Sequence, residues 1–259
     1  MNIVVLVKQV PDTWAERTLR PDDSTLDRAS VEVVINELDE YAIEEGLRLA
    51  EAHGGEVTIL TMGPEKAGES IRKALSMGAD KAVHLIDDAL AGSDGLATSA
   101  ALAAVLSRIG FDVVILGSES TDARMGVMAA MLAERLGVPQ MSYASKVEID
   151  GTAISINRQA DYGYDRVQST LPAVISVVEK INEPRYPSFK GIMAAKKKPV
   201  ETLSLADIGI DPGQVGLAAA ATEVVSFTNR PPRQAGTVVK DEGDGGVKAA
   251  EFLATQKFI

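Results

Sequence analysis

The sequence predicts an α/β protein with a doubly wound, mostly parallel sheet, an added β hairpin region and an extended C-terminal arm. Two observations lead to this fold class. Short apolar runs recur along the first half of the chain, and amphipathic stretches with the end signals of helices separate them. With 259 residues, 46% of them hydrophobic, the chain is long enough to bury one large core.

Four apolar runs are expected to form buried parallel strands. Each run is continuous and rich in β-branched residues, which is typical of strands that helices cover on both faces. The runs are residues 3–7, 57–62, 82–86 and 113–116. A helix is expected after each of them.

The ends of these helices are marked in the sequence. Asn36 is expected to cap the first helix with its side chain, because Asn accepts a hydrogen bond from first-turn N–H groups and acidic residues follow it. That helix is expected to end at Gly54-Gly55. The other boundaries are Pro64 and Gly78 for the second helix, Ser93-Asp94 and Gly110 for the third, and Gly137 for the end of the fourth.

The pattern changes after Pro139. Residues 145–149 and 153–158 are expected to pair as a hairpin, since Asp150-Gly151 is a favoured two-residue turn. Two more strands are expected at 167–170 and 173–178, and the chain turns irregular from Asn182. The sequence thus divides into a core at 1–181 that includes the hairpin, a segment at 182–199 and a C-terminal extension at 200–259. The end of the extension carries apolar residues that need cover from a partner: Val247, Phe252, Leu253, Phe258 and Ile259.

Composition excludes several classes of protein. The chain has 37 Asp and Glu against 26 Lys and Arg, a net charge of −11 that repels phosphates, so no nucleic-acid partner is expected. It has no cysteine and only two histidines, His53 and His84, which we interpret as structural, and no metal site is expected. No run approaches the roughly 20 apolar residues of a bilayer-spanning helix. The N-terminus lacks a signal-peptide pattern, so we expect a cytoplasmic protein without membrane insertion.

Ligands of open parallel sheets bind beyond the carboxyl ends of the strands, near the point where the strand order reverses. Four segments fall there: 8–14, 36–39, 61–64 and 117–122. The last of these segments offers a glycine, small hydroxyls and backbone N–H groups ahead of a helix, which suits a phosphate or nucleotide. The alternative is a plain loop whose polar residues only cap the helix.

The common catalytic and nucleotide-binding motifs are absent. Neither the P-loop nor the Rossmann glycine pattern is present, and no serine hydrolase or zinc protease motif occurs. We therefore expect no catalytic residue. Two features stay open: Trp14 either contacts a ligand or partner or packs within the fold, and Lys196-Lys197-Lys198 forms either an anion site or a solvated face.

Five stretches carry a resemblance to a known family. They are residues 7–12 (VKQVPD), 36–45 (NELDEYAIEE), 62–64 (MGP), 74–80 (ALSMGAD) and 181–198 (INEPRYPSFKGIMAAKKK). Over nearly its whole length the chain resembles the β subunit of electron transfer flavoprotein, in the group that includes the FixA proteins. The fold that this resemblance implies, adenine nucleotide α-hydrolase-like, agrees with the predicted fold class.

The resemblance implies an electron carrier rather than an enzyme, because the redox chemistry of the family belongs to a flavin. It implies a heterodimer with an α subunit that holds most of one FAD, while the β subunit binds a structural AMP. It further implies that the heterodimer accepts electrons from dehydrogenases, such as the acyl-CoA dehydrogenases of fatty acid oxidation. The electrons then pass to the respiratory chain through a quinone oxidoreductase.

Carried over position by position, the resemblance implies AMP contacts in the four crevice segments. Arg124 is expected to pair with the phosphate, because the polar residues that follow Asp122 in many relatives are replaced here. Thr13 and Leu38 are expected near the FAD. The implied AMP contacts are Leu6, Asn36, Glu37, Leu38, Asp39, Met62, Gly117, Ser118, Glu119, Ser120, Thr121, Asp122, Arg124, Met125, Gly126, Val127 and Met128.

The segment 182–199 corresponds to the family's recognition loop, which docks on partner dehydrogenases. Phe189 stands where relatives present a Leu that enters a hydrophobic pocket, and an aromatic anchor ringed by polar residues is typical of binding hot spots. The implied partner-binding residues are Pro184, Arg185, Tyr186, Pro187, Ser188, Phe189, Ile192 and Met193. The extension 200–259 is expected to pack on the α subunit.

Two alternatives stay open. In electron-bifurcating relatives this subunit binds a second FAD in place of AMP, and residues 91–99 have some likeness to that group. The alternative from another class is a stand-alone adenine-nucleotide-binding stress or signalling module, since the same sheet architecture hosts such proteins. Such a module needs no companion subunit.

Overall fold

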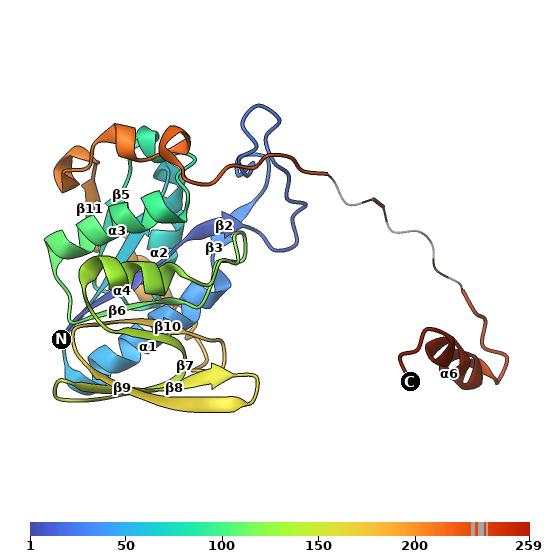
Figure 1. The fold of residues 1–259 in the computed structure, drawn as a ribbon. Helices are drawn as coiled ribbons and strands as arrows, with labels where there is room; N and C mark the ends of the chain where they lie inside the picture. Colours follow the sequence, from blue (N-terminus) through green and yellow to red (C-terminus); the bar gives the residue numbers. More distant parts are fainter. Residues whose placement is uncertain (229–230, 233–235, 237) are drawn as a thin grey trace. The chain divides into compact units, whose positions relative to one another are not determined.

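The structure, a computed structural model, describes residues 1–228, 231–232, 236 and 238–259. The chain divides into two compact units, Met1–Glu223 and Val224–Ile259. The first unit contains the main sheet and the helices that cover it (Figure 1). The compact first unit therefore extends well beyond residue 199.

The main sheet has the predicted doubly wound form. Its nine strands lie in the order β11-β5-β4-β1-β6-β10-β7-β8-β9 (Figure 1). Neighbours from β11 to β7 are parallel, and β8 and β9 are antiparallel to theirs. Since β1 lies between β4 and β6, the chain winds outward in both directions from this point. The strands are β1 Asn2–Leu6, β4 Glu56–Met62, β5 Lys81–Leu85, β6 Val113–Gly117, β7 Gln140–Asp150, β8 Ala153–Ala160, β9 Gly163–Thr170, β10 Ala173–Val177 and β11 Val200–Leu203.

Helices cover the sheet on both faces because β1 is apolar from Ile3 to Leu6. Ile3 and Val5 join one core with α1 (Glu37–His53) and α2 (Gly68–Met77). Val4 and Leu6 join the other core with α3 (Gly95–Ile109) and α4 (Met128–Leu136). The continuous apolar run is thus explained by burial on both sides. Short 3₁₀ turns complete this unit: η1 Glu65–Ala67, η2 Asp88–Leu90, η3 Ala206–Ile208, η4 Pro212–Gln214 and η5 Leu217–Ala219.

Most of the predicted element boundaries are confirmed. The Asp94 side chain caps α3 by accepting from the Ala97 N–H, and Gly137 ends α4 in the left-handed conformation. The hairpin is confirmed, but its turn lies one residue later than predicted, because Asp150 pairs with Ala153.

One predicted helix start is wrong, and one predicted side-chain cap is not formed. Pro64 precedes the 3₁₀ turn η1, and α2 begins only at Gly68. Asn36 directly precedes α1 but does not cap it with its side chain, which bonds to residues 119 and 121 instead. The Asn36 side-chain amide cannot cap α1 because its oxygen and nitrogen are already bonded to the loop after β6.

Four elements of the first unit were not predicted, namely the strand β11 and the three that follow here. β2 (Gln9–Pro11) and β3 (Val33–Ile35) pair as a short antiparallel ribbon, with residues 12–32 between them. α5 (Phe189–Ala195) forms within the stretch that looked irregular. Each is too short for its sequence periodicity to stand out.

The second unit contains one helix, α6 (Gly245–Thr255), at the predicted apolar-periodic stretch. In the part of this unit that the structure describes, α6 has no buried residue, and Val247, Phe252, Phe258 and Ile259 are exposed. Among the described residues of the whole chain, none of the helices is long and apolar enough to cross a bilayer.

Candidate functional site

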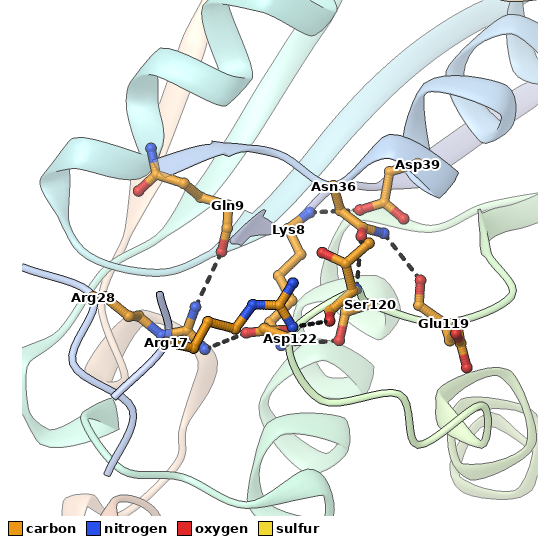
Figure 2. Close-up of polar contacts among 10 residues, drawn as sticks. Lys8, Gln9, Arg17, Arg28, Asn36, Asp39, Glu119, Ser120 and Asp122 are labelled. Carbon is orange, nitrogen blue, oxygen red and sulfur yellow. Dashed lines mark hydrogen bonds and ion pairs between the residues drawn. The ribbon is translucent and has the colours of Figure 1, made fainter. Parts of the chain in front are cut away.

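The carboxyl ends of β1 and β6 meet the start of α1, as the crevice prediction requires (Figure 2). Asp39 joins all three elements: its Oδ2 accepts from the Lys8 N–H at 2.8 Å and its Oδ1 from the Gly117 N–H at 3.2 Å. A Cβ at residue 117 would lie 2.7 Å from Asp39 Oδ1 and 2.8 Å from Leu38 Cβ. Only glycine lets β6 end this close to α1.

Asn36 holds the loop that follows β6. The Asn36 Nδ2 donates to the Glu119 carbonyl at 3.0 Å, and its Oδ1 accepts from the Thr121 N–H at 3.0 Å. Asn36 is only 1% exposed, so this bidentate contact is made away from water (Figure 2). The buried amide fixes the backbone of the loop.

Asp122 is held by two cations from outside the loop. Lys8 Nζ lies 2.8 Å from Asp122 Oδ1 and also donates to Ser120 Oγ at 3.2 Å. Arg28 Nη2 lies 2.5 Å from Asp122 Oδ2, and Arg17 Nη1 donates to the Thr121 carbonyl at 2.6 Å (Figure 2). The stretch 12–32 is thereby bonded to the loop.

The two carboxyl groups have opposite electrostatic surroundings. Burial raises the pKa of Asp39 to about 7, against the hydrogen bonds from the Lys8 and Gly117 N–H groups. Burial also acts to raise the pKa of Asp122, but the charges of Lys8 and Arg28 and their hydrogen bonds outweigh it and hold that pKa at about 2. Asp122 is therefore ionised at neutral pH, and its charge is neutralised locally.

The start of α4 provides backbone N–H groups, which are the donors that an anion needs. Val127 stands at the N-cap, and among the described residues no side chain caps this nine-residue helix. Its first N–H groups therefore have no partner within the helix. Gly126, with φ of 66°, leads into it, and Tyr143 Oη donates to the Gly126 carbonyl at 3.1 Å. The residues present fit a phosphate group.

The other implied AMP and FAD residues lie at varied depths. Leu6 is buried at the end of β1, and Met62 and Leu38 are half-buried. Arg124 is exposed, with φ of 50°, and its N–H donates to the Ser120 carbonyl at 2.8 Å. Exposed too are Glu37, Met125, Val127 and Thr13.

The segment 182–199 presents apolar side chains outward. Tyr186 is 93% exposed and Phe189 80%, and Ile192 and Met193 are about half exposed. Ser188 caps α5 by accepting from the Gly191 N–H at 3.0 Å. Arg185 points the other way, toward carboxylates of α1.

Several functional contacts were missed from the sequence. Arg17 and Arg28 lie between β2 and β3, where no pattern indicates that they approach residues 121 and 122. Lys8 carried a usable signal, because it follows a buried strand directly.

The open features are decided by contacts. Lys198 is neither an anion site nor solvated: its Nζ donates to the carbonyls of Leu75, Gly78 and Ala79 and so caps the end of α2. Trp14 is 95% exposed, so it does not pack within the fold. His84 Nε2 bonds to the Gly63 carbonyl at 3.0 Å, in agreement with a structural role.

Comparison with known proteins gives a consistent family. The model of the electron transfer flavoprotein domain matches residues 23–208. The electron transfer flavoprotein subunit beta of Mycobacterium tuberculosis is 53% identical over all of this chain and 99% of the relative, and that of Mycobacterium leprae is 52% identical over the same shares. The caffeyl-CoA reductase-Etf complex subunit CarD of Acetobacterium woodii is 35% identical over 92% of each chain.

Proposed function

The chain belongs to the β-subunit family of electron transfer flavoproteins, and from this premise we propose that it forms, with an α subunit, a heterodimeric carrier of electrons. The observation that carries the proposal is the identity of 53% with a β subunit over the full length of both chains. The chain itself is proposed to perform no bond-making step. Its proposed roles are to bind a nucleotide, to position the residues near the flavin and to dock partner proteins.

The proposed nucleotide of this subunit is AMP. The uncapped start of α4 would hold the phosphate with the N–H groups of residues 126–128, and the exposed Arg124 would pair with its charge. Asn36, Asp39 and Asp122 keep the loop in place from below. The role of the last three is to shape the site, because their polar atoms are already bonded within the chain.

FAD, held mostly by the α subunit, supplies the redox chemistry when it is bound. We propose that Thr13 and Leu38 of this chain lie near it. Thr13 is exposed in the stretch 12–32, which Arg17 and Arg28 bond to the nucleotide loop. The same contacts therefore hold the flavin-facing stretch and the AMP loop together.

Residues 182–199, called the docking segment from here on, are proposed to bind partner dehydrogenases such as acyl-CoA dehydrogenases. The support is the outward position of Tyr186, Phe189, Ile192 and Met193, an apolar set that the first unit leaves exposed. Pro184, Pro187 and Ser188 shape this surface. Onward transfer to the respiratory chain through a quinone oxidoreductase completes the proposed route.

A count of bound groups tests the proposal. The chain is co-expressed with its α subunit, and FAD and AMP are measured in the purified heterodimer. One FAD and one AMP per heterodimer agree with the proposal. Two FAD and no AMP indicate the bifurcating form, an alternative that the relative in a caffeyl-CoA reductase-Etf complex keeps open. A chain that binds adenine nucleotide without any α subunit or flavin is a stand-alone module.

A further inference from the structure

Arg185 faces inward while its neighbours face outward. Its guanidinium binds Glu44 through Nε at 2.7 Å and Nη2 at 3.0 Å, and Glu51 through Nη1 at 2.6 Å and Nη2 at 3.2 Å. The Arg185 N–H also donates to Glu44 Oε2 at 3.1 Å. One residue thus ties the docking segment to two successive turns of α1.

The charges make this contact strong. The Glu44 side chain is only 8% exposed, so its carboxylate depends on Arg185 for a charge partner, whereas Glu51 is 61% exposed. The hydrogen bonds that Arg185 donates to Glu44 and Glu51 raise its pKa further above the ordinary value. The planar fork of a guanidinium can bind both carboxylates with paired hydrogen bonds, a geometry that an ammonium group does not reproduce.

Two other polar side chains also bond the docking segment to the helices beneath it. Asn182 Nδ2 donates to the Tyr41 carbonyl and to Glu45 Oε2, each at 3.1 Å. At the far end, Arg72 Nη1 donates to the Ala195 carbonyl at 2.8 Å. The polar residues therefore hold the backbone, and the apolar residues between them stay free for a partner.

We infer that Arg185 is a positioning residue for docking: by gripping Glu44 and Glu51 it holds the docking segment in its binding-competent shape and does not itself contact the dehydrogenase. Four of its five guanidinium N–H groups are already bonded within the chain. Preorganisation of this kind reduces the ordering cost of binding. The inference rests on the proposed docking function, but the effect of Arg185 on the order of the docking segment can be measured without any partner.

The first test is hydrogen exchange of the heterodimer without a dehydrogenase. Arg185→Met is expected to speed exchange of the amides of 184–195 by about tenfold or more, and not that of β1 and β6. Glu51→Gln, at an exposed position, should do the same to a lesser degree. Arg108→Met is the matched control, because Arg108 also joins a helix to a later segment, through the Asp207 carbonyl. Unchanged exchange in Arg185→Met overturns the inference.

The second test separates positioning from contact by kinetics. The probe is the acyl-CoA dehydrogenase that reduces the wild-type heterodimer. Suppose that Arg185→Met leaves the docking segment in its binding-competent shape in about one tenth of the molecules. The rate of association with the dehydrogenase then falls about tenfold, and the dissociation rate stays unchanged. Phe189→Ala should instead raise the dissociation rate, because it removes a contact. Arg185→Lys is expected to recover part of the association rate.

A double variant completes the design. Adding Glu51→Gln to Arg185→Met should change neither the hydrogen exchange nor the association rate any further, since both substitutions break the same contact. A faster dissociation in Arg185→Met, with normal hydrogen exchange, would make Arg185 a partner contact and refute the inference. If the wild-type heterodimer binds no dehydrogenase, the docking function fails, while the exchange experiment still decides whether Arg185 orders the segment.

Discussion

Asp39 and Asp122 lie at the same end of the sheet, yet their side chains have different surroundings. The Asp39 carboxyl is bonded by backbone N–H groups, and burial raises its pKa to about 7. The pKa of Asp122 is about 2, because Lys8 and Arg28 outweigh its burial. The ordinary pKa of both is 3.8, so folding shifts them in opposite directions.

The first prediction follows from the sign of these shifts. Asp39 binds its proton more tightly in the folded state, so its contribution to stability is present below about pH 4 and is lost as the pH rises toward 7. Asp39→Asn should abolish this decline between pH 5 and 8, and should cost about 1–3 kcal/mol because one N–H loses its acceptor. Urea unfolding at pH 5, 6.5 and 8 measures it. Asp112→Asn, at an exposed position, is the control, and an unchanged slope in Asp39→Asn contradicts the prediction.

Asp122 gives the opposite prediction. Its stabilising contribution is present above about pH 4 and is lost as the pH falls toward 2. Asp122→Asn is expected to lower the free energy of unfolding by about 2 kcal/mol at pH 7 and by only about 1 kcal/mol at pH 2.5. Equal losses at both pH values would show that the charge of Asp122 is not the cause.

Phe189 carries the third prediction at this scale. Phe189→Ala is expected to slow reduction of the heterodimer by a dehydrogenase, with a loss of about 2 kcal/mol in docking, while the FAD content stays intact. Tyr162→Ala removes an aromatic ring of similar exposure, 79%, outside the docking segment and serves as the control. Equal loss of FAD and of docking would mean that Phe189 supports the fold.

At the scale of elements, the nucleotide loop depends on how closely β6 approaches α1. Gly117→Ala places a Cβ within 2.8 Å of Asp39 and Leu38, so the end of β6 must move away from the helix. The expected result is loss of bound AMP and a destabilisation of about 1–3 kcal/mol. Gly68→Ala is the matched control, because that helical position has open space and an ordinary φ of −55°. If the Gly117→Ala heterodimer retains its full content of AMP, the nucleotide does not bind at the loop after β6.

Elements differed in how well the sequence predicted them. β1 and β6 were visible as continuous apolar runs, and the helix α3 was visible from its end signals. β2 and β3 have three residues each, too few for a period, and they exist because they pair with each other. α5 forms on seven residues because Ser188 caps it and α2 supports it: Gly191 lies so close to α2 that a Cβ there would collide with the Ser76 carbonyl oxygen.

At the scale of the whole molecule, the first unit has its own core and the second has an exposed helix. Removal of 224–259 is therefore expected to leave the thermal unfolding of the remaining chain almost unchanged, and to weaken its binding to the α subunit at least tenfold. Circular dichroism and mass photometry of the heterodimer measure these two effects. A collapse of the first unit on truncation would refute the prediction.

The sequence by itself determined the doubly wound fold class, the alternation of strands and helices in the first half of the chain, and the segments at the crevice, since these follow from apolar runs and end signals. Tertiary structure alone decided which side chains complete the site. Arg28 and Asp122 are 94 residues apart in the chain, and Arg185 and Glu44 are 141 apart. The partner of a charged group depends on which distant segments the packed core brings within hydrogen-bonding distance, and no local pattern encodes that. The same reason redirected Asn36 from the helix it precedes to the loop it holds.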